Sequence, residues 1–153
     1  MKSAVPDDDK QKLFHLVMID DDVEDIYTTQ RAFSTLAGEI DFRAFTNATG
    51  FFEELEGAPA PDLILLDLNM HEPSGLEVLG RLRAAPDWRF IPVVILTTSE
   101  EIEDAKRALL AGANAVVTKP SSLRDMGMLA LAIHNFWNAP SLMVPPVRLV
   151  SAE

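Results

Sequence analysis

The chain has 153 residues, 48% of them hydrophobic, and contains no cysteine. It can therefore form one packed domain, but no disulfide, thiolate nucleophile or cysteine-ligated metal centre. Its formal net charge of −11, with no cluster of Lys or Arg, opposes binding to DNA or RNA. Because no apolar run approaches the roughly 18 residues of a membrane span, we expect a cytoplasmic protein that contacts neither nucleic acid nor membrane.

The first half of the chain alternates between strand-like and helix-like segments after a polar N-terminal tail at residues 1–12. Residues 13–19 are mostly apolar and predict a strand, and residues 24–37 have helical spacing. Residues 40–45 alternate between apolar and polar, which predicts a second strand, and residues 48–56 predict a short helix.

The second half continues the alternation. Residues 62–66 are continuously apolar, as in a parallel strand covered on both faces, and a loop with Pro73 and Gly75 leads into a helix. Ser122 can cap a long last helix that ends near Asn138. The remaining predicted elements are helices at 76–85 and 100–112 and strands at 91–97 and 114–118.

Strands that alternate with helices predict an α/β fold in which right-handed crossovers build a doubly wound parallel sheet. We expect the flavodoxin-like (βα)5 arrangement with strand order 2-1-3-4-5. One domain spans residues 13–138 and an extension follows at residues 139–153. Ligands of such sheets bind beyond the carboxyl ends of strands 1 and 3.

Polar residues follow the apolar runs at the points where the predicted strands end. Asp20 and Asp21 follow the first strand, Asp67 follows the third, Thr97 closes the fourth and Lys119 follows the fifth. A parallel sheet gathers these ends along one edge. Three carboxylates, a hydroxyl and an ammonium group suit the binding of Mg²⁺ and a phosphoryl group.

These residues resemble the site of the receiver domain of two-component response regulators, with Gly75 eight residues after Asp67 as a further shared feature. The resemblance covers roughly residues 13–138. Within that family, the segments DLNM, PSGLEVL, RFIPVVILTTS and GANAVVTKP are similar to stand-alone receivers that partner phytochrome-type histidine kinases.

The resemblance implies a role for each site residue. Asp67 is the implied phosphoacceptor, which takes the phosphoryl group from a phosphohistidine of the partner kinase. Thr97 and Lys119 are implied to bind phosphoryl oxygens. Asp21 and Asp67 are implied to bind Mg²⁺ directly and Asp20 largely through coordinated water, and the main-chain carbonyl of Asn69 is an implied further ligand. The resemblance thus implies a phosphoacceptor with intrinsic autodephosphorylation rather than an enzyme with an external substrate.

Four positions also matter for the signal. Asn69 and Ser99 lie where the family positions the water that hydrolyses the acyl phosphate. The Lys119–Pro120 bond is a candidate for a cis peptide, because such bonds are essentially confined to proline. Val116 replaces the aromatic residue that often reports phosphorylation in the family, which argues against an aromatic switch at this position.

Other acidic residues of this region have a simpler interpretation. Asp22, Glu24 and Asp25 come at the predicted start of the first helix. Carboxylates at that position cap the helix and interact favourably with its dipole. We therefore assign these three residues to helix stabilisation rather than to the site.

Two other functions remain open on the sequence. One is a Mg²⁺-dependent aspartyl phosphohydrolase, although such enzymes generally need a second acid two residues after the nucleophile, where this chain has Asn69. The other is a protein-binding module that is never phosphorylated.

The last helix predicts a homodimer. One apolar stripe is expected to face the sheet, and Met128 and Leu131 lie on nearly the opposite side. A helix that is apolar on two sides usually buries both, so we expect Met128, Leu131 and the tail SLMVPPVRLV to form the interface. The alternative is that these are two isolated surface residues. The residues of the stripe are Leu123, Met126, Leu129, Ile133, Phe136 and Trp137.

Overall fold

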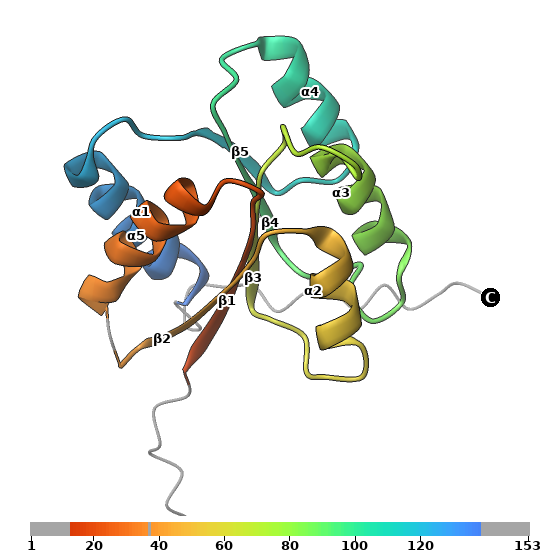
Figure 1. The fold of residues 1–153 in the computed structure, drawn as a ribbon, viewed down its shortest axis with the longest axis horizontal. Helices are drawn as coiled ribbons and strands as arrows, with labels where there is room; N and C mark the ends of the chain where they lie inside the picture. The colour runs from red at the N-terminus through yellow and green to blue at the C-terminus, as the bar shows by residue number, and fades with distance from the viewer. Residues whose placement is uncertain (1–12, 37, 139–153) are drawn as a thin grey trace, which may run out of the picture.

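The computed structural model describes residues 13–36 and 38–138, in which strands and helices alternate along the chain (Figure 1). The strands are β1 (Phe14–Ile19), β2 (Ile40–Phe45), β3 (Leu63–Leu66), β4 (Val93–Thr97) and β5 (Ala115–Thr118). The helices are α1 (Val23–Phe33), α2 (Ala48–Leu55), α3 (Gly75–Ala84), α4 (Ile102–Leu110) and α5 (Leu123–Trp137), with a 3-10 turn at Ser34–Leu36. The expected tail at 1–12 and extension at 139–153 lie outside the described residues.

The five strands form one parallel sheet in the order β2-β1-β3-β4-β5, which confirms the predicted fold class. The register keeps the carboxyl ends of the central strands level. Ile19 pairs with Leu66, Leu66 pairs with Ile95, and Thr97 pairs with Thr118. Residues that follow β1, β3 and β5 are therefore delivered to the same edge of the sheet.

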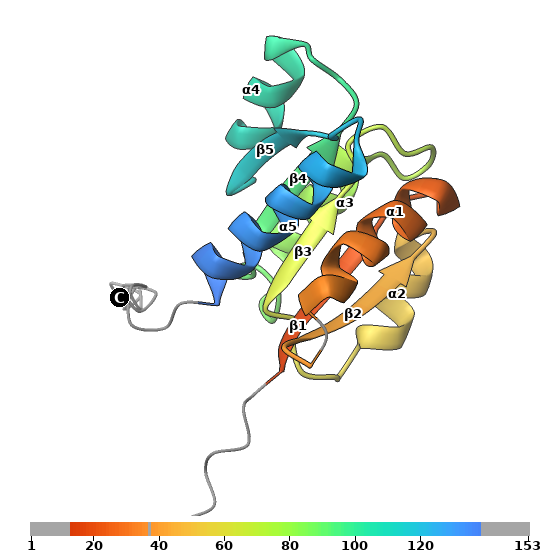
Figure 2. The same ribbon diagram turned by 90° about the vertical axis from the view of Figure 1, so that its left-hand side faces the viewer.

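Helices cover both faces of the sheet, with α1 and α5 on one side and α2, α3 and α4 on the other (Figures 1 and 2). Successive residues of a strand point to opposite faces. Along β1, Leu16 and Met18 pack towards α1 and α5, whereas Val17 and Ile19 pack towards α2 and α3. Because helices shield both faces of the sheet from solvent, β3 and β4 are apolar at every position before Thr97.

Short polar side chains fix where four of the helices begin. Asp22, Asn47, Ser74 and Ser122 each accept a hydrogen bond from a backbone N–H in the first turn of the helix that follows. Such caps satisfy N–H groups that have no partner within the helix. The cap at Asp22 starts α1 directly after the acidic pair, so the chain turns sharply at the sheet edge.

Gly75 begins α3 against the backbone that follows β3. A Cβ atom there would collide with the carbonyl oxygen of Asp67 and would lie 2.6 Å from the Cα atom of Leu68. The Gly75 N–H donates to the Leu68 carbonyl at 3.2 Å. Only glycine permits this close contact between the start of α3 and the backbone after β3. The contact fixes the loop that carries Asp67.

The face that α5 turns to the sheet is narrower than the sequence predicts. Met126, Ala130, Ile133 and His134 are its buried residues, whereas Leu123 and Phe136 are 52% and 64% exposed. Both exposed residues lie near an end of the helix, where its neighbours no longer cover it. No helix within residues 13–36 and 38–138 has the length and apolar character that a membrane crossing requires.

Candidate functional site

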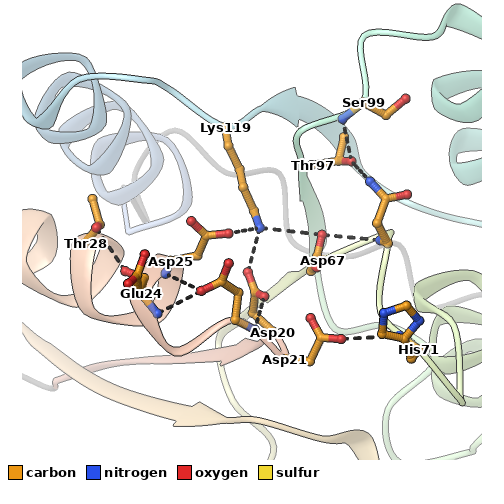
Figure 3. Close-up of polar contacts among 12 residues, drawn as sticks. Asp20, Asp21, Glu24, Asp25, Thr28, Asp67, His71, Thr97, Ser99 and Lys119 are labelled. Carbon is orange, nitrogen blue, oxygen red and sulfur yellow. Dashed lines mark hydrogen bonds and ion pairs between the residues drawn. The ribbon is translucent and has the colours of Figure 1, made fainter.

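Three carboxylates meet at the carboxyl edge of the sheet. Asp20 and Asp21 follow β1 and Asp67 follows β3, and the Asp67 N–H donates to the Ile19 carbonyl at 3.0 Å. One oxygen from each of the three carboxylates lies within 4.8 Å of the others. The structure thus brings together the residues that the sequence places at these strand ends (Figure 3).

The three carboxylates fit a divalent cation. Their ligand atoms are hard oxygens, which suit Mg²⁺, Mn²⁺ or Ca²⁺. Asp20 and Asp67 are buried and Asp21 is exposed, so the cluster is closed towards the core and open to solvent at Asp21. Hydrogen bonds orient two of the groups, because Asp20 Oδ1 accepts from the Asp22 N–H at 2.9 Å and Asp21 Oδ2 from the His71 N–H at 3.3 Å. The Asn69 carbonyl stays a predicted ligand.

The buried position of Asp20 makes its negative charge unfavourable. Burial raises the pKa of Asp20 to about 6, and the nearby charge of Asp67 adds to this effect. The hydrogen bonds from Lys119 and from the Asp22 N–H oppose the shift without cancelling it. A divalent cation would favour the ionised form and thereby compete with the proton.

Lys119 extends from the end of β5 to the acidic cluster and is almost fully buried there. Its Nζ lies 2.8 Å from Asp20 Oδ2, 2.6 Å from Asp25 Oδ2 and 3.6 Å from Asp67 Oδ1. Burial lowers the pKa of Lys119, but the hydrogen bonds to Asp20 and Asp25 and the charges of Asp20 and Asp67 outweigh it and raise the pKa overall. The lysine is therefore a permanent ammonium group beside Asp67.

Thr97 places its hydroxyl at the same edge of the sheet, where two donor groups already contact its oxygen. Its Oγ1 accepts hydrogen bonds from Asn69 Nδ2 at 3.0 Å and from the Ser99 N–H at 3.1 Å. With its acceptor positions used, the hydroxyl proton is free to be donated to a phosphoryl oxygen. The Ser99 hydroxyl instead donates to Asp104 Oδ2 of α4 at 2.7 Å.

The expected cis peptide at Lys119–Pro120 is wrong. Within the described residues, the cis peptide bond lies between Glu72 and Pro73, in the loop before α3. The direction of Lys119 has another cause, since its N–H donates to the Thr97 carbonyl at 2.7 Å and continues the β4–β5 ladder by one residue.

Asp25 is the residue that sequence reasoning missed. Its ion pair with Lys119 places it inside the charge network, whereas the sequence assigns it to helix stabilisation alone. The cap is made by Asp22, whose Oδ1 accepts from the N–H groups of Glu24 and Asp25. The sequence offers no signal for this contact, because a carboxylate in a first helical turn already has a local explanation.

Comparisons with known proteins agree with this geometry. Residues 16–130 match the family model of the response regulator receiver domain. Response regulator Rcp1 of Synechocystis is 40% identical over 84 residues, which cover 55% of this chain and 57% of Rcp1. That match spans little more than half of either protein.

Two solved structures extend the comparison. The phosphorylated cyanobacterial phytochrome response regulator RcpA is 26% identical with a TM-score of 0.77, covering 88% of this chain and 99% of RcpA. The Mn²⁺-bound form of Rcp1 is 31% identical with a TM-score of 0.69, covering 86% of this chain and 98% of the Rcp1 chain. The chain therefore belongs to the response regulator receiver domain family, whose members are phosphorylated on an aspartate and take the phosphoryl group from a histidine kinase.

Proposed function

We propose that Asp67 is the aspartate that accepts the phosphoryl group and that Mg²⁺ is the cation of the site. The arrangement that supports this most strongly is the position of the Asp67 carboxylate, which lies in the three-carboxylate cluster and 3.6 Å from the Lys119 ammonium group. A nucleophile there has a cation site on one side and a fixed positive charge on the other.

The transfer needs little covalent chemistry from the protein. A carboxylate oxygen of Asp67 forms a bond to the phosphorus of a phosphohistidine, and the P–N bond breaks with its electron pair returning to the imidazole ring. The transition state is loose, so catalysis rests on position and charge. Asp20, Asp21 and Asp67 would hold Mg²⁺, which would supply positive charge to the phosphoryl oxygens when bound. Lys119 and Thr97 donate to the oxygens that remain.

Loss of the phosphoryl group follows from attack by water on the same phosphorus. Asn69 is exposed and lies beside Thr97, and Ser99 is two residues further along the chain from Thr97. These are the two side chains that we propose to set the rate of autodephosphorylation. Because the Ser99 hydroxyl donates to Asp104, its effect on water depends on the position of α4.

We further propose a phytochrome-like photoreceptor kinase as the partner. The support is the similarity to RcpA, a phytochrome response regulator, and to Rcp1. The lack of cysteine is compatible with the reducing cytoplasm, where we propose that the protein acts. Signalling would then depend on which protein surface the phosphorylated domain presents.

A second copy of this protein, in a homodimer, is the other proposed partner. Met128 and Leu131 of α5 are 61% and 49% exposed, as a dimer interface on that side of the helix requires. Exposed apolar residues at neighbouring positions of one helix favour association with another apolar surface. The tail SLMVPPVRLV, which the sequence also assigns to the interface, lies outside the described residues.

Acetyl phosphate with Mg²⁺ tests the proposed phosphorylation. Intact-protein mass spectrometry should show a gain of one phosphoryl group that requires Mg²⁺ and disappears in Asp67→Asn. Glu77→Gln, at the exposed start of α3, is a matched control that should still gain the group. Repeated turnover of external phosphate esters would favour a phosphohydrolase instead, and no mass change would favour an unphosphorylated binding module.

A further inference from the structure

The shortest of the ion pairs around Lys119 involves a residue that has no role in the proposed transfer. Asp25 Oδ2 lies 2.6 Å from Lys119 Nζ, compared with 2.8 Å for Asp20 and 3.6 Å for Asp67 (Figure 3). Charge-assisted N–H···O bonds are about 2.7–2.9 Å long. Lys119 is thus bound to Asp20 and Asp25, and Asp67 lies beyond hydrogen-bond range.

Lys119 faces three carboxylates with a single positive charge. An ammonium group has three N–H donors, and two of them already go to Asp20 and Asp25. A phosphoryl group on Asp67 would bring further negative oxygens towards the same cation. One donor remains, so the competition is for the position and charge of the ammonium group, which the Asp25 carboxylate holds close to α1 and away from a phosphoryl group on Asp67.

Exposure decides which carboxylate can release the lysine. The side chain of Asp20 is fully buried, so losing its partner would leave a carboxylate without solvent. The side chain of Asp25 is 36% exposed, so water can replace the ammonium group there. Asp25 is the partner that Lys119 can leave at the smaller free-energy cost.

We propose that Asp25 is a positioning residue that holds Lys119 on the α1 side of the site and weakens binding of the phosphoryl group to Asp67. The inference rests on the proposed role of Asp67 as phosphoacceptor. Asp25 acts only through Lys119. When a phosphoryl group draws Lys119 away, the Asp25 carboxylate loses its ion pair, and this loss links the site to the first turn of α1. Helix capping does not explain the contact, because Asp22 already caps α1.

Binding of beryllium fluoride, a phosphoryl analogue, tests this at saturating Mg²⁺. We would measure the dissociation constant by ¹⁹F NMR for the unmodified protein, Asp25→Asn and Glu24→Gln. Glu24 is the matched control because it lies in the same helical turn and carries the same charge, yet it makes no side-chain ion pair in the described residues. Asp25→Asn should bind about five- to tenfold more tightly, and Glu24→Gln should change by less than about twofold.

Other outcomes separate the inference from the function on which it rests. If the unmodified protein binds and Asp67→Asn does not, equal or weaker binding by Asp25→Asn would overturn the inference alone. If the unmodified protein does not bind beryllium fluoride, the proposed function fails and the inference fails with it. Urea unfolding of each variant completes the test, since a purely structural role would lower stability without tightening binding.

Discussion

At the scale of single residues, the site is a small set of carboxylates that share one ammonium group. Asp20, Asp25 and Asp67 all lie within 4 Å of Lys119 Nζ. The pKa values of Asp20 and Lys119 are both raised, for different reasons. Burial outweighs the bond to Lys119 at Asp20, whereas the hydrogen bonds and charges of the carboxylates outweigh burial at Lys119.

The raised pKa of Asp20 predicts a pH dependence of stability. The pKa is about 6 in the folded protein, compared with 3.8 for an unperturbed aspartate in an unfolded chain. Between these values the folded state binds more protons, so the free energy of unfolding falls as pH rises towards 6 and stays low above it. With chelator present, lowering the pH from 7 to 5 should add about 1 kcal/mol to this free energy from Asp20 alone.

Urea unfolding of the unmodified protein and of Asp20→Asn at pH 7, 6 and 5 measures this contribution. Other carboxylates titrate in both proteins, so the difference between their profiles isolates Asp20. Saturating Mg²⁺ should remove that difference, because the cation keeps Asp20 ionised. Parallel profiles in the presence of chelator would contradict the prediction.

At the scale of elements, the loop between β3 and α3 fixes the position of Asp67. Gly75→Ala places a Cβ atom against the Asp67 carbonyl, 2.6 Å from Leu68 Cα and 2.9 Å from the Leu68 carbonyl oxygen. These are backbone atoms, which cannot move aside as a flexible side chain can. We expect a loss of about 1–3 kcal/mol in stability and a shift of Asp67 that slows its phosphorylation by acetyl phosphate.

Gly80→Ala is the control within the same helix. Apart from the backbone of α3 itself, no atom of the described residues lies within 4 Å of a Cβ at that position. Alanine is also the better helix former by up to about 1 kcal/mol. Thermal unfolding should therefore show opposite shifts for the two variants. An unchanged melting temperature and an unchanged phosphorylation rate for Gly75→Ala would show that the loop can relax.

The elements also show what the sequence can predict. Apolar runs such as LILL and VVILT fix the buried strands, and the polar residues after them fix the sheet edge, so Asp20, Asp67 and Thr97 follow from pattern alone. Asp25 does not, because a carboxylate in a first helical turn has a sufficient local explanation. Its contact depends on Lys119, which lies 94 residues away in sequence.

Side-chain exposure was likewise beyond the sequence pattern at the ends of α5. Helical spacing places Phe136 at the margin of the apolar stripe, but only the positions of neighbouring elements decide whether such a residue is covered. Phe136 packs on Trp137 with ring centroids 4.6 Å apart and still exposes 64% of its surface. Periodicity therefore fixes the centre of a buried face better than its borders.

At the scale of the whole molecule, the exposed apolar residues of α5 lead to the prediction of a dimer. Met128 is 61% exposed and Leu131, three residues later, is 49% exposed, so the two side chains are neighbours on the helix surface. If this surface is buried between two chains, Met128→Glu places an unpaired carboxylate in the interface. A penalty of about 3 kcal/mol would weaken association roughly a hundredfold.

Size-exclusion chromatography with light scattering, at protein concentrations from low micromolar upward, measures the effect. The unmodified protein should have twice the mass of the 16.9 kDa chain, and Met128→Glu should have the mass of one chain. Leu110→Glu on α4 is the control, because Leu110 is 89% exposed and belongs to a different helix; it should remain dimeric. Because Met128 is exposed in the single chain, the substitution should leave thermal unfolding of the monomer unchanged, so loss of the dimer cannot be attributed to loss of the fold. A concentration-independent monomer before any substitution would refute the interface and leave the phosphoacceptor site untouched.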